Sequence, residues 1–171
     1  QPLWNLTGNG YSISEAIVNN PEDTYTTTIL GGITAKAKIT EGLTNTFKIG
    51  ATNVRFRREN YMKPNSVLQG YVGDADNPGS KTDNGSMSLN YVITNLLSYN
   101  KVFAEKHDVT LTGLFEFNKN TSRSYSLSSI GFSNPDFSVQ SVAALPDATS
   151  TSLFENTVLG YGAFLDYNYD G

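Results

Sequence analysis

The sequence predicts an all-β fold, part of the wall of an antiparallel transmembrane β-barrel with long extracellular loops. Three observations predict it: apolar and polar residues alternate with a period of two, the alternating stretches are long, and the connections between them alternate between short and long. Successive side chains of a strand point to opposite faces, so each stretch has one apolar and one polar surface. Strands of globular proteins span about 5 to 6 residues, whereas a strand crossing a bilayer needs about 9 to 11.

The first expected strand, residues 25–40, has its apolar side chains at odd positions and mostly Thr and Lys at even positions. Its apolar residues are Tyr25, Ile29, Ile33, Ala35, Ala37 and Ile39. The second, residues 44–60, sets Phe47, Ile49 and Ala51 against Thr46, Lys48 and Thr52. The few residues around Gly42 leave room only for a tight turn between these two strands.

The third and fourth expected strands, residues 86–103 and 108–122, keep the same alternation and are joined by the short segment 104–107. Their apolar residues are Met87, Leu89, Tyr91, Ile93, Leu97 and Tyr99, then Val109, Leu111, Phe115 and Phe117. The fifth, residues 157–170, reads TVLGYGAFLDYNYD, with Leu159, Tyr161, Ala163, Leu165, Tyr167 and Tyr169 on one face. Aromatic residues near strand ends are typical of membrane–water interfaces, although tyrosine is also a common strand residue.

Long polar segments alternate with the short turns. They cover residues 1–22, 61–85 and 123–156, and we expect them to be extracellular loops. Outer-membrane barrels have short periplasmic turns and longer external loops, which is the same arrangement. The first, third and fifth strands are therefore expected to run toward the periplasm.

Composition excludes several classes. Hydrophobic residues make up 38% of the chain, the mean hydropathy is −0.33, and no run of apolar residues is long enough for a transmembrane helix. Without cysteine there is neither a disulfide framework nor a thiolate metal site. A net charge of −4 without a basic stripe argues against a nucleic-acid partner. No cofactor is expected.

Neither catalysis nor metal binding has support in the sequence. His107 is the only histidine and falls in an expected turn, so no Ser-His-Asp triad or two-histidine metal site can form. Glu116 and Asp166 both face the polar side, but a glycosidase pair requires a defined separation. The loop GDADNPGSKTDNG begins like a calcium loop, yet Pro78 occupies the third ligand position and no Glu closes the motif. The chain is expected not to be an enzyme.

Two segments resemble a known family. They are LLSYNKVFAEKHDVTLTGLFEFNKNTSRSYS, from Leu96, and GYGAFLDYNYDG, from Gly160. Both are similar to segments of the SusC/RagA-type TonB-dependent outer-membrane transporters of Bacteroides-like bacteria. Five antiparallel strands leave two unpaired edges that lipid cannot satisfy, so residues 1–171 are expected to be a partial barrel domain.

The resemblance implies a 22-stranded barrel filled by a plug and located in the bacterial outer membrane. It also implies a SusD-like surface lipoprotein as a lid, a TonB–ExbB–ExbD complex as the energy source, and import of oligosaccharides or peptides. We expect neither the plug nor the TonB box within these residues. The remaining expected partners are the rest of the barrel and outer-membrane lipid.

For substrate contact, the sequence offers aromatic residues in the expected external loops: Trp4, Tyr71, Phe132 and Phe137. Aromatic rings and neighbouring amides suit sugar binding, but the same residues could anchor one loop against another or against the lid. The basic cluster Arg55, Arg57 and Arg58 is either a solvated strand end or a contact for lipopolysaccharide or an anionic substrate. The polar strand faces, with Lys36, Lys38, Lys48, Glu116 and Asp166, would pack on a plug or wet a lumen.

Two other classes remain open. A porin or adhesin-type barrel without TonB dependence would share the strand pattern but lack the plug and the lid. A soluble β-rich carbohydrate-binding domain would also alternate, with its apolar faces packed against each other. Dependence on detergent separates that second class from a membrane barrel.

Overall fold

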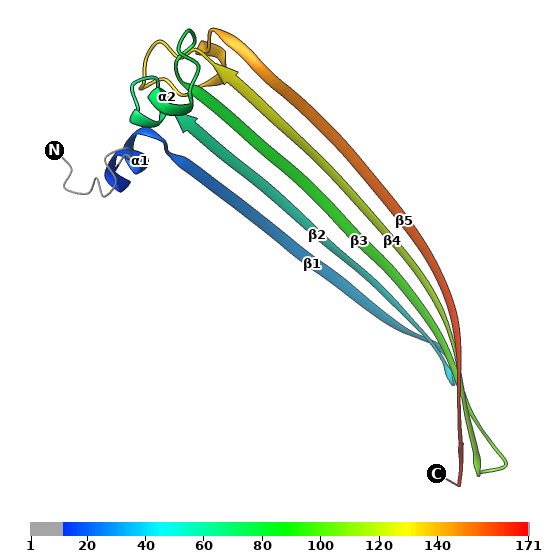
Figure 1. The fold of residues 1–171 in the computed structure, drawn as a ribbon. Coiled ribbons are helices and arrows are strands. Elements are labelled where there is room, and N and C mark those ends of the chain that lie inside the picture. Colours follow the sequence, from blue (N-terminus) through cyan, green and yellow to red (C-terminus); the bar gives the residue numbers. More distant parts are fainter. Residues whose placement is uncertain (1–11, 171) are drawn as a thin grey trace. The chain divides into compact units, whose positions relative to one another are not determined.

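The computed structural model describes residues 12–170, and its principal element is one antiparallel sheet. The five strands are β1 (Glu22–Thr40), β2 (Leu43–Met62), β3 (Ser80–Phe103), β4 (His107–Ile130) and β5 (Leu145–Tyr169). They are hydrogen-bonded in chain order, β1-β2-β3-β4-β5 (Figure 1). The predicted all-β fold with consecutive antiparallel strands is therefore confirmed. No helix among residues 12–170 is long and apolar enough to cross a membrane.

The chain divides into two compact units, which we describe separately. Unit 1 combines Arg55–Met87 and Arg123–Leu153 with the residues before Thr28. Unit 2 combines Thr28–Val54 and Ser88–Ser122 with the residues after Leu153. Unit 1 holds the long connections, and unit 2 holds the short turns.

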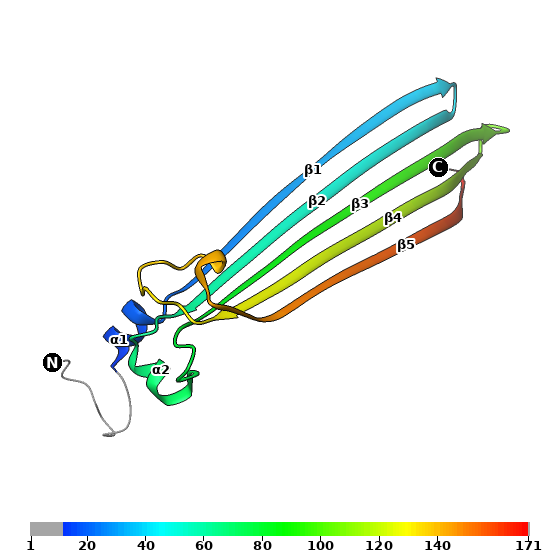
Figure 2. The same ribbon diagram turned by 90° about the horizontal axis from the view of Figure 1, so that it is seen from above.

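In unit 2, the turns between β1 and β2 and between β3 and β4 lie at the same end of the strands (Figure 2). The first turn uses Gly42 in the left-handed region, with a φ of 75°. The second places Ala104 and Glu105 there, with φ values of 49° and 60°. The backbone N–H of Asn100 donates to the carbonyl of Gly42 at 2.9 Å, so the first turn is also fixed to β3.

The strands extend well beyond their predicted ranges on the loop side. β3 starts at Ser80 rather than residue 86, β4 continues to Ile130 rather than 122, and β5 starts at Leu145 rather than 157. Segments 80–85 and 145–156 have polar residues on both faces and carry no alternation signal, whereas segment 123–130 does alternate, with Tyr125 and Leu127 between serines, and the prediction ended that strand too early. Strand pairing does not require alternating side chains, because the ladder hydrogen bonds are made by main-chain groups. The predicted loops 61–85 and 123–156 therefore shrink to 63–79 and 131–144.

Unit 1 also contains short helices that the alternation did not predict: α1 (Ile13–Asn19) before β1, α2 (Val67–Val72) between β2 and β3, and the 3₁₀ helix η1 (Gln140–Val142) between β4 and β5. Ser12 caps α1 by accepting a hydrogen bond from the backbone N–H of Glu15, and Ser66 caps α2 in the same way through Gln69. The Glu15 carboxylate accepts the backbone N–H of Val67 at 2.7 Å, which connects the two helices.

Candidate functional site: two faces of the sheet and a loop cluster

The side chains of unit 2 are sorted between two faces. We call the face of the odd-numbered strand residues the apolar face and that of the even-numbered residues the polar face. On the apolar face, Ile33 and Leu165 are each 69% exposed and Tyr161 is 78% exposed. In the described residues, only Tyr61 and Phe132 are buried hydrophobic residues, and both belong to unit 1. The apolar face is therefore open along its strands, which is unlike the packed face of a soluble sandwich.

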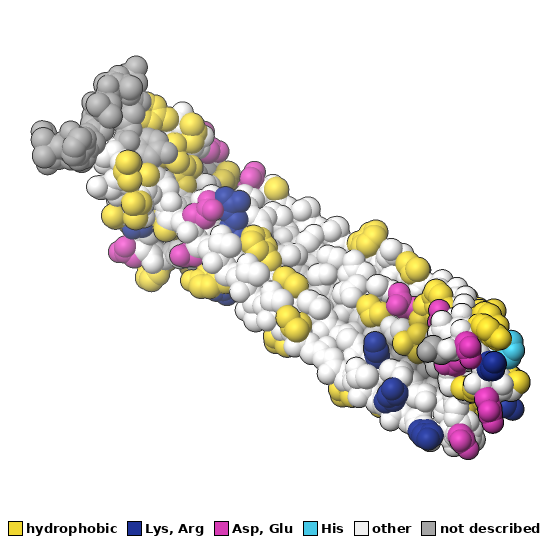
Figure 3. Space-filling view, turned by 90° about the horizontal axis from the view of Figure 1, so that it is seen from below, with side chains coloured by type: hydrophobic (Ala, Val, Ile, Leu, Met, Phe, Trp, Pro, Cys, Tyr) yellow, Lys and Arg dark blue, Asp and Glu magenta, His cyan; other side chains and the backbone are white. Residues whose placement is uncertain are grey.

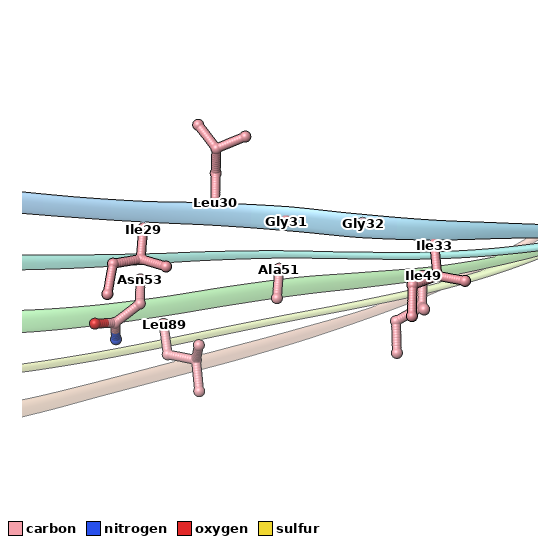
Figure 4. Close-up of a pocket in the computed structure, with 9 residues that line it drawn as sticks. All are labelled: Ile29, Leu30, Gly31, Gly32, Ile33, Ile49, Ala51, Asn53 and Leu89. Atoms are coloured by element: carbon pink, nitrogen blue, oxygen red, sulfur yellow. The ribbon is translucent and has the colours of Figure 1, made fainter.

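A shallow hollow of about 520 Å³ lies on β1 to β3 of unit 2. Its small residues are Gly31, Gly32 and Ala51, and larger apolar side chains surround them. Figure 4 shows Ile29, Ile33, Ile49 and Leu89 on one side of the sheet and Leu30 on the other. Leu30 thus lies on the polar face.

The polar face carries a ladder of side-chain hydrogen bonds between β3 and β4. Asn90 donates to Asn118 at 3.2 Å, and the Ser98 and Thr112 hydroxyls lie 2.7 Å apart. Thr94 donates to the Glu116 carboxylate at 3.4 Å. These polar groups satisfy one another while they leave a hydrophilic surface.

Charges on the polar face of unit 2 are separated by strand. Lys36, Lys38 and Lys48 lie on β1 and β2, whereas Glu116 and Asp166 lie on β4 and β5. Figure 3 shows several basic side chains (dark blue) spaced along one face, with acidic side chains (magenta) in the same regions. Within residues 12–170, none of the three lysines forms an ion pair. Such a lining requires water or a polar partner.

At the end of unit 2 that holds the turns, the apolar face finishes in aromatic residues. Nδ1 of His107 lies 2.8 Å from the Tyr167 hydroxyl, and its ring centroid is 5.2 Å from that of Tyr169. The Lys101 ammonium lies over the ring of Phe103 at 5.2 Å. His107 is the first residue of β4 rather than part of the turn, and its ring contacts two tyrosines of β5.

The four aromatic residues proposed for substrate contact have different environments. Tyr71 on α2 is 58% exposed and Phe137 is 59% exposed, so both rings are accessible. Phe132 is only 1% exposed and packs edge-to-face on Tyr61, with ring centroids 5.1 Å apart. For Phe132 the structure therefore favours the loop-anchoring alternative over substrate contact. Trp4 lies outside the described residues.

The acidic loop after α2 is an Asx-type turn. The Asp74 carboxylate accepts backbone N–H groups from Asp76 at 2.8 Å and Asn77 at 3.2 Å, and the Asn77 side chain donates to it as well. These hydrogen bonds lower the pKa of Asp74, because they favour the ionised carboxylate. Its oxygens are thus occupied by neighbouring donors, as is common for Asp in a turn.

One polar hollow of unit 1 was not predicted from the sequence. It measures about 260 Å³ and is lined by Phe56, Asn84, Gly85, Ser86, Ser124, Tyr125, Ser126 and Ser150. By the two-residue period, Phe56 lies on the polar face among Ser and Asn side chains. An aromatic residue at an even position is only a weak signal for such a hollow, because Phe154 and Phe164 also stand at even positions of β5.

Comparisons with known proteins identify the fold of the chain. No family model and no curated protein matches it. The structure of the RagAB peptide transporter is similar, with a TM-score of 0.79 and 18% identity over 90% of this chain and 17% of that chain. RagAB peptide importer structures in the open-open and closed-closed states give TM-scores of 0.78 and 0.71 at 19% identity.

These comparisons show the class of fold, which is an antiparallel β-sheet that matches part of a transporter chain. More specifically, the sheet matches a segment of the RagAB structures, and this chain spans 17% of the length of the chains it matches. At 18–19% identity, the likeness concerns the fold. The matched proteins are described as transporters or importers rather than enzymes.

Proposed function

We propose that this chain forms part of the barrel wall of a SusC-like, TonB-dependent outer-membrane transporter. The transporter imports peptides or oligosaccharides together with a SusD-like surface lipoprotein. Residues 1–171 supply wall and loops, and the plug and the TonB-contacting segment belong to other parts of the complete protein. The wall itself is not an enzyme and requires no cofactor.

The observation that carries the proposal is the exposed apolar face of unit 2. Ile33, Leu165 and Tyr161 project from a single-layer sheet, so their natural environment is hydrocarbon. On the other face, the ladder of Asn, Ser and Thr side chains suits a lumen or a polar plug. The structural likeness to the RagAB structures supports the same assignment.

Two observations bear on the class of transported substrate. The similar structures are described as peptide transporters or importers, which favours peptides. The polar hollow around Phe56 combines an aromatic ring with hydroxyl and amide groups, which suits either a peptide backbone or a sugar. Uptake of a labelled peptide and a labelled oligosaccharide by cells producing the complete protein distinguishes them.

Single-cysteine labelling tests the topology. This chain has no cysteine, so a background without other cysteines permits Asn134→Cys in the β4–β5 loop and Glu105→Cys in the β3–β4 turn. We expect a membrane-impermeant maleimide to label Asn134→Cys on intact cells and Glu105→Cys only after the outer membrane is permeabilised. Equal labelling of both residues on intact cells would contradict the transmembrane arrangement.

Co-purification tests the partners. The complete protein, extracted from membranes with detergent, is expected to bring a surface lipoprotein with it, and intact-mass spectrometry identifies each polypeptide. A protein that stays folded and soluble without detergent would instead support the β-rich carbohydrate-binding domain. A detergent-dependent barrel that contains no plug would support a porin or an adhesin-type barrel.

A further inference from the structure

The basic residues of β2 in unit 1 divide between two faces of the strand. Arg55 and Arg57 share the odd positions of β2 with Ile49 and Ala51. Arg58 projects to the opposite face, where it pairs with Glu22 at 2.6 Å. The apparent cluster of three arginines is therefore two separate features, and only one of them lies on the apolar side of the strand.

The residues at the odd positions of β2 and β4 change from apolar to basic along the sequence. On β2 the odd positions pass from Ile49 and Ala51 through Asn53 to Arg55. On β4 they pass from Phe117 through Lys119 to Arg123. Within unit 1, Tyr125, Leu127 and Leu153 stand at odd positions, as these arginines do, and such a mixture of apolar and cationic side chains suits the headgroup region of a lipid layer.

Tyrosine rings lie near the arginines of β2 and β4 in unit 1. The Arg57 guanidinium lies 4.8 Å from the centroid of the Tyr25 ring and pairs with Glu59 at 3.2 Å. The ring of Tyr125 on β4 covers Gly85 on β3 so closely that a Cβ at Gly85 would collide with it. Tyrosine and arginine together are typical of the region between hydrocarbon and water.

The register of the sheet places Arg55 two strands away from Tyr125. The ion pair between Glu59 and Lys81, at 3.1 Å, aligns β2 with β3, so Arg55 faces Gly85 in the antiparallel pairing. Tyr125, which covers Gly85, therefore lies about 10 Å from Arg55, or two strand spacings. Arg123 is two residues from Tyr125 on the same face of β4.

A hollow beside Arg123 completes the surface. It measures about 480 Å³ and is lined by Arg123, Ser124, Tyr125, Thr151, Ser152 and Leu153. A guanidinium, a phenol hydroxyl, a threonine hydroxyl and a leucine there combine phosphate-binding groups with apolar contact. Within residues 12–170, neither Arg55 nor Arg123 forms an ion pair, so both charges are available.

We propose that this surface, centred on Arg55, Arg123 and Tyr125, binds the phosphorylated headgroup of a lipid in the surrounding membrane leaflet. The inference rests on the proposed function, because it requires the apolar face to contact lipid. A lipid is favoured over a soluble anionic substrate, since Arg55 and Arg123 stand at odd positions, as do Tyr125 and Leu153 of the same unit, and not at the even positions that carry serines. Arg57 is committed to Glu59 and Tyr25 and acts as a supporting charge.

The test uses the complete protein, purified in detergent, with diphosphorylated lipid A as the probe and native mass spectrometry as the readout. The double variant Arg55→Gln/Arg123→Gln is expected to bind this lipid at least about tenfold more weakly than the unchanged protein. Arg58→Gln is the matched control, because it removes an arginine from the same strand on the opposite face. We expect its lipid affinity to remain unchanged. Dephosphorylated lipid A is expected to bind all variants with the same, weaker affinity.

The proposal would be overturned if the double variant bound the lipid as tightly as the unchanged protein, or if Arg58→Gln lost as much lipid affinity as the double variant. Full displacement of the lipid by millimolar inorganic phosphate would also overturn it, because it would indicate a site for the free ion. Failure of the proposed function is distinguishable, since it would appear as a protein that needs no detergent and does not insert into membranes. A double variant that inserts normally and still binds the lipid refutes only the headgroup site.

Discussion

At the scale of single residues, Gly42 has the strictest backbone requirement in unit 2. Its φ of 75° is unfavourable for residues with a side chain, and a Cβ there would collide with the carbonyl oxygen of Asn100. Gly42→Ala is therefore expected to destabilise the assembled protein by more than about 1 kcal/mol, measured as a lower midpoint of thermal unfolding in detergent.

Gly31→Ala is the control for this prediction. Gly31 lies on β1 without a left-handed backbone, and no atom beyond its chain neighbours comes within 4 Å of the place that an alanine methyl would take. The substitution is therefore expected to leave the midpoint nearly unchanged. If both variants lowered the midpoint equally, the loss would reflect glycine flexibility in general rather than the geometry of the turn.

The face on which a residue lies could be predicted from the sequence, but the pairing of particular polar side chains could not. The alternation assigned Ile29, Ile33 and Ile49 to one face, and they do share it (Figure 4). The alternation could not account for Asn45 and Asn95 at odd, otherwise apolar positions. In the structure their side-chain amides bond to each other at 3.0 and 3.2 Å, so each polar group satisfies the other. Such a pair depends on strand register, which sequence periodicity alone does not specify.

At the scale of elements, the order and type of the strands could be predicted, but the loop-side start of β5 could not. The start of β5 at Leu145 shows the reason, because segment 145–156 carries Ser, Thr and Asp without regular alternation. Apolar and polar residues alternate where the two faces of a sheet meet different environments, and the alternation is lost where both faces meet water. The helices α1 and α2 are too short to produce a helical period, although their caps Ser12 and Ser66 are recognisable afterwards.

The two long connections of unit 1 are fastened to each other around Phe132. Its backbone N–H donates to the Pro78 carbonyl at 2.8 Å, and that of Gly131 donates to the Gly79 carbonyl at 3.0 Å. Phe132→Ala would remove a fully buried ring from a small cluster, at a local cost on the order of 3 kcal/mol. We expect faster limited proteolysis within 63–79 and 131–144.

Phe137→Ala provides the matched comparison, because that ring is largely exposed in the same connection. It is expected to leave the proteolysis rate unchanged, and any reduction in substrate uptake by this variant would then report on binding rather than on loop folding. A proteolysis rate that rises as much for Phe137→Ala as for Phe132→Ala would contradict the anchoring role of Phe132.

At the scale of the whole molecule, the assignment of faces makes a prediction that depends only on residue parity. Leu111 and Ile93 are on the apolar face, and their sequence neighbours Thr112 and Thr94 are on the polar face. Arginine on the lipid side of a barrel near the bilayer midplane costs about 2 to 4 kcal/mol, whereas a polar interior accepts it at much lower cost. We therefore expect Leu111→Arg and Ile93→Arg to impair folding into the membrane, and Thr112→Arg and Thr94→Arg to impair it much less.

The measurement is the folded fraction of the complete protein after insertion into lipid vesicles, read from its heat-dependent mobility on gels across a denaturant series. Thr112→Arg also removes a hydroxyl contact with Ser98, at 2.7 Å, so a modest loss of roughly 1 kcal/mol is expected there even with a polar lining. The difference in folding free energy between the apolar-face and polar-face variants must exceed that loss. Equal costs on the two faces would mean that both meet the same medium, in which case neither the lipid contact of the apolar face nor the barrel wall could be retained.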